Sequence, residues 1–263
     1  KLRVAIERLS VLCTKHPRYR EALELAERLV AHPVGPDVTA ADLQEVRQWR
    51  IALYRHLGRY RDASRHARAE WKRLRSSNID TSYDQQARAT AVFAACQYDL
   101  HCFDEMCQML TPWWRRLKRH PRMVTPLTRV MVYNTLARAM VALSSPGWEA
   151  HYYCSLDILS KTEPLDLART YNYLLHGLLR EGRLDEAEAV VCSLQSLPAM
   201  SEFSQWMLGF GRADLACRRG TTWSDPGLDA MAQAEDVWGH ALGFYLQATA
   251  RQPGRSLSDA TSR

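Results

Sequence analysis

Two short segments of the chain share one turn-forming pattern, and this repetition constrains the fold more than any other feature. They are Leu57–Ala63 (Leu-Gly-Arg-Tyr-Arg-Asp-Ala) and Glu181–Ala187 (Glu-Gly-Arg-Leu-Asp-Glu-Ala). In each, a glycine ends one helix, an apolar residue two positions on packs back against it, and a small residue lets the next helix approach closely. Weaker copies lie at Pro17–Ala22 and Cys102–Met106. The pattern predicts a chain of helical hairpins.

Hydrophobic periodicity favours helices over most of the sequence. Apolar residues recur at helical spacing in Tyr19–Leu29 and Phe103–Trp113, for example, and no alternating run typical of a strand is found. Because proline disfavours a helix interior, prolines such as Pro112, Pro126 and Pro164 are expected to divide the chain into short helices. We therefore predict an all-α fold.

The spacing of the turns predicts how many hairpins there are. The positions taken as equivalent are Ala22, Ala63, Met106, Ala150 and Ala187, which gives steps of 41, 43, 44 and 37 residues. A sixth unit is expected around Phe203–Gly220 and Leu228–Ala248. Hairpins of this kind stack into an α-solenoid, in which each unit buries its apolar face on its neighbours. We expect about five to six stacked hairpins in residues 1–250, followed by a polar tail at 251–263.

Charge is distributed unevenly along the chain. Residues 1–138 contain 25 basic and 14 acidic side chains, whereas residues 139–263 contain 10 and 15. The two parts carry +11 and −5, which add to the overall +6. A preference for arginine codons would explain why arginine outnumbers lysine, but it would not explain this asymmetry. The basic part predicts an anionic partner such as nucleic acid, and the acidic part is expected to face protein partners.

One group of basic residues forms a stripe on a predicted helix. The stripe consists of Arg61, Arg65, Arg68, Lys72 and Arg75, spaced by 4, 3, 4 and 3 residues. This spacing places all five on one helix face. Residues 47–75 as a whole contain ten basic and two acidic side chains. Because the guanidinium fork suits phosphate oxygens, the stripe predicts phosphate contact. The alternative is a solvated outer face.

A second basic group combines cations with tryptophan. Its members are Trp114, Arg115, Arg116, Lys118 and Arg119, and residues 115–138 hold seven basic residues and no acidic one. Trp113 is expected in the core because of its spacing from Leu110 and Leu117, whereas Trp114 is expected to be exposed. Aromatic rings beside cations can stack on bases while the cations hold the backbone. An acidic protein surface is the alternative partner.

Residues 169–194 closely resemble a pentatricopeptide repeat. The matching positions are Thr170-Tyr171-Asn172, Leu174, Gly177-Leu178, Gly182–Ala187 and Leu194. A second start, Val132–Leu136, lies 38 residues earlier, and its second half is distorted. The remaining units fit either this family or the related tetratricopeptide repeats. The strong match covers one repeat of roughly six, with a second partial one.

The resemblance implies binding of single-stranded RNA, with one base per repeat. The side chain that faces the base is matched by Asn134 and Asn172, whose amides offer both a donor and an acceptor. A second selector is expected near Asp166 and near Glu202. The alternative is that the two asparagines only stabilise helix starts.

Signals for catalysis, cofactors or membranes are missing from the sequence. No standard hydrolase, nucleotide-binding or metalloprotease motif occurs, so no catalytic residue and no cofactor are assigned. His101, Cys102 and Cys107 lie close together without the spacing of a zinc site, so no metal is expected. The seven cysteines include no Cys-x-x-Cys pair, which favours reduced thiols. The longest apolar run, Ala91–Cys96, is far shorter than the roughly 18 residues of a membrane span.

Together these features predict a non-catalytic, RNA-associated helical-repeat protein. The resemblance implies organellar gene expression in the mitochondrial matrix, as a subunit of a mitochondrial ribosome or an RNA-processing complex. Its partners would be rRNA or mRNA and other proteins of that complex, without a membrane. The alternative is a tetratricopeptide-like scaffold that binds proteins, such as the sensor domain of a bacterial regulator or an adaptor, in the cytoplasm.

Overall fold

The computed structural model describes residues 4–5, 7–9, 18–31, 39–76, 82–160, 164–198 and 200–221. Within these ranges the chain is helical and contains no strand, which confirms the predicted all-α class. The helices are α2 (Tyr19–Ala31), α3 (Ala40–His56), α4 (Tyr60–Ser76), α5 (Tyr83–Tyr98), α6 (Phe103–Arg119), the 3₁₀ turn η1 (Pro121–Met123), α7 (Pro126–Ala142), α8 (Trp148–Leu159), α9 (Pro164–Arg180), α10 (Leu184–Gln195) and α11 (Glu202–Arg218). The expected hairpin at Leu228–Ala248 and the expected tail lie outside the described residues.

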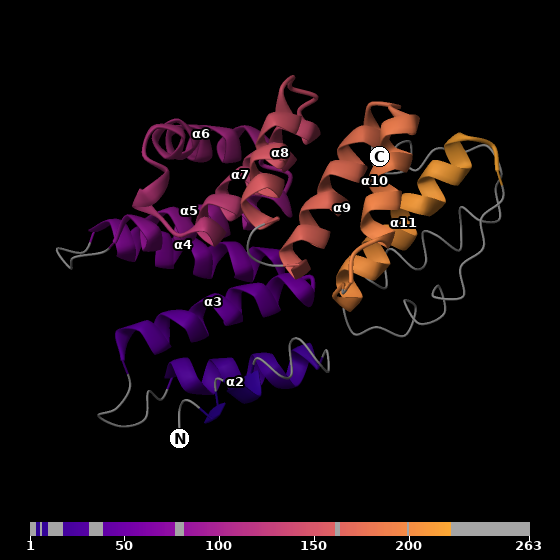
Figure 1. Ribbon diagram of the computed structural model, residues 1–263. Helices are drawn as coiled ribbons and strands as arrows, with labels where there is room; N and C mark the ends of the chain where they lie inside the picture. Colours follow the sequence, from indigo (N-terminus) through magenta and orange to yellow (C-terminus); the bar gives the residue numbers. More distant parts are fainter. Residues whose placement is uncertain are drawn as a thin grey trace.

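Neighbouring helices pack against one another in chain order, as Figure 1 shows from α2 to α11. Short turns join α3 to α4, α5 to α6, α7 to α8 and α9 to α10, so each of these pairs is an antiparallel hairpin. The first helices of successive hairpins also touch, since α5 packs on α7, α7 on α9 and α9 on α11. This arrangement confirms the predicted α-solenoid.

Five helices end in the same turn, and this turn sets the repeat. The residue with positive φ is Gly58, His101, Ser144, Gly182 or Gly220 after α3, α5, α7, α9 and α11 respectively. Each time, the amide of that residue donates to the carbonyl of the residue three positions earlier. The amide of the following residue donates to the carbonyl five positions before its own, as from Arg59 N to Tyr54 O at 2.8 Å. This is the Schellman motif. The motifs lie 43, 43, 38 and 38 residues apart, and two of the five have a residue other than glycine at the positive φ.

The equivalence of Ala150 with the small residues of the other units is wrong by one position. The fourth residue of each second helix is buried, and this residue is Ala22, Ala63, Met106, His151 or Ala187. Ala150 is exposed. The reason is the turn after α7, where Pro146 and Gly147 are added and α8 begins four residues after Ser144 instead of two.

Pro112 does not break a helix, contrary to the expectation that it divides the chain. It lies inside α6, which continues to Arg119. Pro112 is on the exposed side of the helix, where water can satisfy the carbonyl that loses its partner. Pro126 and Pro164, by contrast, are the first residues of α7 and α9, a position at which proline costs no hydrogen bond.

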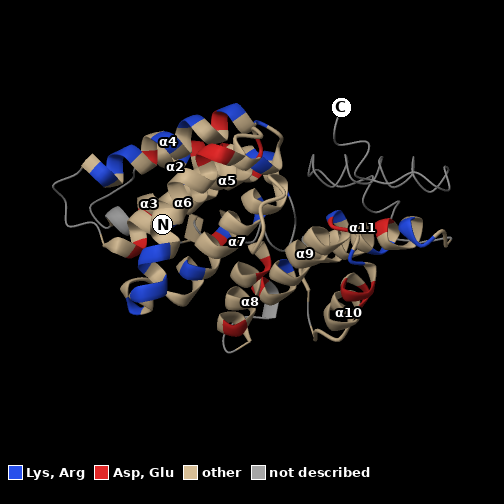
Figure 2. Ribbon diagram, turned by 90° about the horizontal axis from the view of Figure 1, so that it is seen from above, with Lys and Arg blue, Asp and Glu red and all other residues tan. Residues whose placement is uncertain are grey.

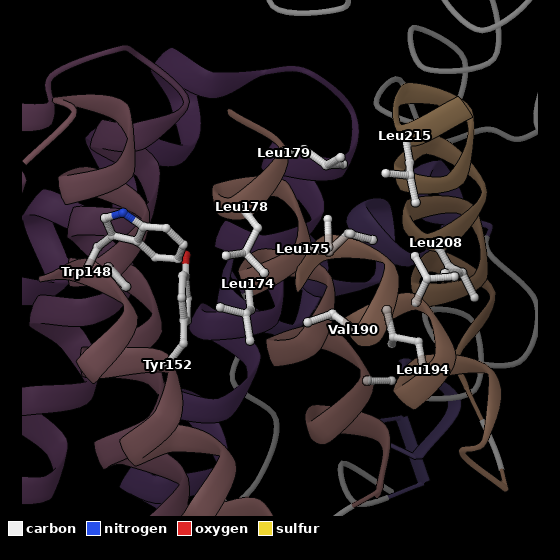
Figure 3. Packing of buried hydrophobic residues seen from close by; sticks show 14 residues of the cluster. Trp148, Tyr152, Leu174, Leu175, Leu178, Leu179, Val190, Leu194, Leu208 and Leu215 are labelled. Atoms are coloured by element: carbon white, nitrogen blue, oxygen red, sulfur yellow. The ribbon is translucent and has the colours of Figure 1, made fainter. Parts of the chain in front are cut away.

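Close packing of buried side chains joins the hairpins at the C-terminal end of the described chain. Figure 3 shows Trp148 and Tyr152 of α8 beside leucines of α9, which in turn meet α10 and α11. Trp148 is 1% exposed and its indole nitrogen donates to Glu181 at 2.6 Å. A side chain at Gly177 would place its Cβ 2.6 Å from the Trp148 ring, so glycine is needed for this approach of α8 and α9.

Candidate nucleic-acid interface

Asn134 and Asn172 lie in the interior, so the prediction that they face an RNA base is wrong. Their exposed fractions are 7% and 1%. The Asn134 amide donates to Thr170 Oγ1 at 2.8 Å, and the Asn172 amide donates to the carbonyl of Ser204 at 3.0 Å. The two asparagines therefore tie α7 to α9 and α9 to α11.

The alternative role for these asparagines, the stabilisation of helix starts, is also wrong. Each lies eight residues after the first residue of its helix, Pro126 or Pro164, and so in the third turn. Of the two residues named as expected second selectors, only Asp166 has a side chain that the structure describes. Asp166 lies in the first turn of α9 and pairs with Arg169 at 3.4 Å, and the side chain of Glu202 lies outside the described residues.

Trp114 is also not the exposed aromatic residue that the sequence predicts. It is half-buried, with its ring centroid 4.8 Å from that of Tyr133 and 4.2 Å from that of His151. The reason is that α6 packs on α5 and on α7, so more than one of its faces is covered. Trp113 packs at the margin of the core formed by α5, α6 and α7.

The five residues of the stripe are exposed on one face of α4, as the spacing predicts. Their electrostatic surroundings differ along the helix. Near its N-terminus Arg65 pairs with Asp62 at 2.7 Å, and Arg68 lies 3.8 Å from Glu105 of α6. Towards the C-terminus, Lys72 and Arg75 have no acidic partner among the residues that the structure describes. The stripe is therefore partly neutralised at one end and uncompensated at the other.

Antiparallel packing brings the uncompensated end of α4 to the same edge of the solenoid as the C-terminal end of α6. The N-termini of α5 and α7 lie at this edge too, because the Thr125 amide donates to Asp84 at 2.6 Å. The Arg116 guanidinium lies 5.5 Å from the centroid of the Tyr83 ring, so α6 ends beside the start of α5. Cations are also favourable at helix C-termini because of the helix dipole.

We call this region the basic edge and define it by eight cations. They are Lys72, Arg75, Arg115, Arg116, Lys118, Arg119, Arg122 and Arg129. Within the described ranges none of the eight forms an ion pair with an acidic side chain. In Figure 2 blue segments run along α4, whereas red segments lie on α8 and α10.

At the opposite edge, which contains the Schellman turns, arginine is matched by carboxylates. Arg55 reaches Asp99 through two nitrogens, with Nη2 3.2 Å from Oδ1. Arg183 contacts three glutamates, and Arg219 pairs with Asp185 at 2.8 Å. Charge at this edge is largely compensated, which leaves the basic edge as the stronger attractor of anions.

An exposed aromatic ring and a hollow accompany the cations of the basic edge. Tyr83 is 50% exposed, and Arg116 lies over both its ring and that of Trp113, at 5.5 Å from each centroid. A hollow of about 410 Å³ is lined by Pro121, Arg122, Val124, Pro126 and Arg129. The buried Nε of Arg129 has no hydrogen-bond partner.

The sequence pointed to this site only in part. Arg122 and Arg129 lie in the acid-free stretch 115–138, but the RNA contacts that the sequence predicts in the second basic group end at Arg119. Tyr83 had no distinguishing signal, because its exposure and its place beside Arg116 depend on the packing of α5 against α6.

A comparison with known protein families finds no match, and a search of curated proteins finds no relative of this chain. Among the described helices none is long and apolar enough to span a membrane. The described residues contain no group of three or more histidine, cysteine or acidic side chains that could hold a metal ion.

Proposed function

We propose that this chain is a non-catalytic, RNA-associated helical-repeat protein that holds RNA by its phosphates along the basic edge. The observation that carries the proposal is the convergence of eight cations, from α4, α6, α7 and the η1 turn, without acidic partners in the described structure. Contacts of this kind position a nucleic acid but read no sequence. The burial of Asn134 and Asn172 agrees with that mode, since neither amide is available to a base edge.

The ligand that fits this edge best is unpaired RNA. A half-exposed tyrosine with an arginine over its ring offers a platform on which a splayed base can stack. The neighbouring hollow, with two arginines and two prolines in its lining, offers a second place for a base next to its phosphate. A duplex presents no free base faces for either feature.

The test is RNA binding by the purified chain at several salt concentrations. The key variant replaces Arg116, Arg119 and Arg122 with alanine. A matched control replaces Arg20, Arg180 and Arg212, which are exposed, lie off the basic edge and form no ion pair in the described structure. Three lost phosphate contacts should make the slope of log affinity against log salt shallower by about 2 for a single strand. The control should keep the slope of the wild type.

Equal losses in both triple variants would mean that net charge, and not this edge, causes binding. No binding of single-stranded or structured RNA at low salt would reject the proposal and favour a tetratricopeptide-like scaffold for an acidic protein. A pull-down with the same two triple variants would then test whether the basic edge serves that partner.

The proposed compartment is the mitochondrial matrix, and the proposed assembly is a ribosome or an RNA-processing complex. Both rest on the resemblance of residues 169–194 to a pentatricopeptide repeat. Tagging the chain in its own cells and following its sedimentation with and without ribonuclease tests both. A cytoplasmic signal, or sedimentation that ribonuclease leaves unchanged, would contradict this part of the proposal.

A further inference from the structure

A small pocket between α3 and α4 is lined mainly by basic side chains. Its volume is about 200 Å³, and its lining includes Arg47 and Arg50 of α3 and His66, Glu70 and Arg73 of α4. The guanidinium of Arg73 donates to both carboxylate oxygens of Glu70, from Nη2 at 2.6 Å and from Nε at 3.0 Å. These two charges compensate each other, so Arg47 and Arg50 determine the charge of the pocket.

Arg50 forms no ion pair with a carboxylate that the structure describes, although Glu27 and Glu70 are near enough to raise its pKa. Its Nε is buried without a hydrogen-bond acceptor, and its Nη2 lies 3.2 Å from Nδ1 of His66. Burial is the largest single influence on the pKa of Arg50, and it lowers this pKa. A buried donor without an acceptor is costly, and native structures satisfy nearly all such groups. An anion in the pocket would give the Arg50 guanidinium a counter-charge.

His66 has a ring N–H that is free to donate to such an anion when its Nδ1 accepts from Arg50. A guanidinium can only donate, so Nδ1 of His66 accepts from Arg50, and the neutral ring carries its proton on Nε2. The ring stacks on Tyr54 with centroids 5.2 Å apart. Burial, Arg50 and Arg65 lower the pKa of His66, while Asp62 and Glu27 oppose them. A bound anion would act in the opposite direction and raise this pKa.

We propose that the pocket between α3 and α4 binds a phosphate group, either as free phosphate or at the end of a nucleotide chain. Two arginine forks match the oxygens of a phosphate in geometry and charge. The volume admits a tetrahedral oxyanion together with the first atoms attached to it. The inference does not rest on the proposed RNA binding, because the lining residues lie outside the eight cations of the basic edge.

The test follows the His66 ring by NMR during pH titrations of the wild-type chain in chloride and in inorganic phosphate. We expect phosphate to raise the pKa of His66 saturably, and calorimetry to give the affinity. Arg50→Lys keeps the charge but loses the fork, and Arg47→Ala removes a half-buried lining residue. Each should weaken phosphate binding by about tenfold or more. Arg212→Ala removes one exposed charge from α11, away from the pocket, and should leave the affinity within about twofold.

An unchanged His66 titration in phosphate would overturn the proposal, as would an Arg212→Ala variant that loses as much affinity as Arg47→Ala. Competition then assigns the source of the phosphate. Displacement of inorganic phosphate by a 5′-phosphorylated oligonucleotide, but not by its 5′-hydroxyl counterpart, supports a chain end. Displacement by neither supports free phosphate. The triple variant of the basic edge should bind inorganic phosphate like the wild type, which separates a failure of this site from a failure of the RNA interface.

Discussion

The side-chain amide of Asn134 donates to the hydroxyl oxygen of Thr170, and this bond joins two helices that both begin hairpins of the solenoid. The distance is 2.8 Å, and the same hydroxyl donates onward to the carbonyl of Asp166. Asn172 makes the equivalent link one unit later, to Ser204. The asparagines that the resemblance assigned to RNA thus hold successive units together.

Asn172→Ala should destabilise the fold without weakening RNA binding. The change removes one buried hydrogen bond between α9 and α11, which contributes about 0.5–1.5 kcal/mol. Urea unfolding measures the loss, and RNA binding at fixed salt measures the affinity. A variant that remains as stable as the wild type but binds RNA more weakly would show that the amide reaches RNA after all.

Tyr83→Ala should weaken the binding of single-stranded RNA while leaving stability almost unchanged. Stacking of one base on an aromatic ring contributes about 1–3 kcal/mol, equivalent to a tenfold loss or more. Tyr153 of α8 is the matched control, since it is 52% exposed and lies off the basic edge. Equal effects of Tyr83→Ala and Tyr153→Ala on RNA affinity would contradict a stacking role at this edge.

Acid should destabilise the fold through His151. Burial lowers the pKa of His151 from the ordinary 6.5 to about 4. The unfolded chain therefore binds more protons than the folded chain between these pH values, and stability falls as pH decreases through this window. A shift of this size corresponds to a loss of up to roughly 3 kcal/mol. His176, also with its pKa lowered to about 4 by burial, adds to the effect.

The variant His151→Phe tests this origin of acid sensitivity. Phenylalanine keeps a ring against Trp114 and removes Nδ1, which is buried without a partner. The variant should lose less stability than the wild type between neutral pH and pH about 5, as measured by urea unfolding at each pH. Parallel curves for the two proteins would assign the acid sensitivity to other groups.

Gly177→Ala should destabilise the protein although alanine is the better helix former. The gain in helix propensity is about 1 kcal/mol. The added Cβ, however, would lie 2.6 Å from the ring of Trp148, which is buried and held by Glu181. Overpacking of this kind costs about 1–3 kcal/mol. In a Trp148→Leu background the same change should be neutral or stabilising, and a loss there as large as in the wild type would exclude the clash as its cause.

The helices and the turns built around glycine are the features that local sequence signals predict. Gly58 and Gly182 end helices by hydrogen bonds to carbonyls within five residues, so their neighbours in sequence suffice to recognise them. His101 and Ser144 adopt the same positive φ without glycine. The turn after His101 is visible in the sequence only as the weaker copy at Cys102–Met106, and the turn after Ser144 is placed correctly only by the packed helices.

The order of the helices and the exposure of the stripe on α4 followed from the sequence, because helical periodicity and turn chemistry act over a few residues. The tertiary structure decided where each polar side chain lies. It buried Asn134 and half-buried Trp114, since α7 and α6 pack against other helices on more than one face. It also brought Arg75, Tyr83 and Arg116 to one edge, because antiparallel packing aligns the ends of alternate helices. Such contacts between distant residues depend on how whole helices stack, and no local pattern encodes them.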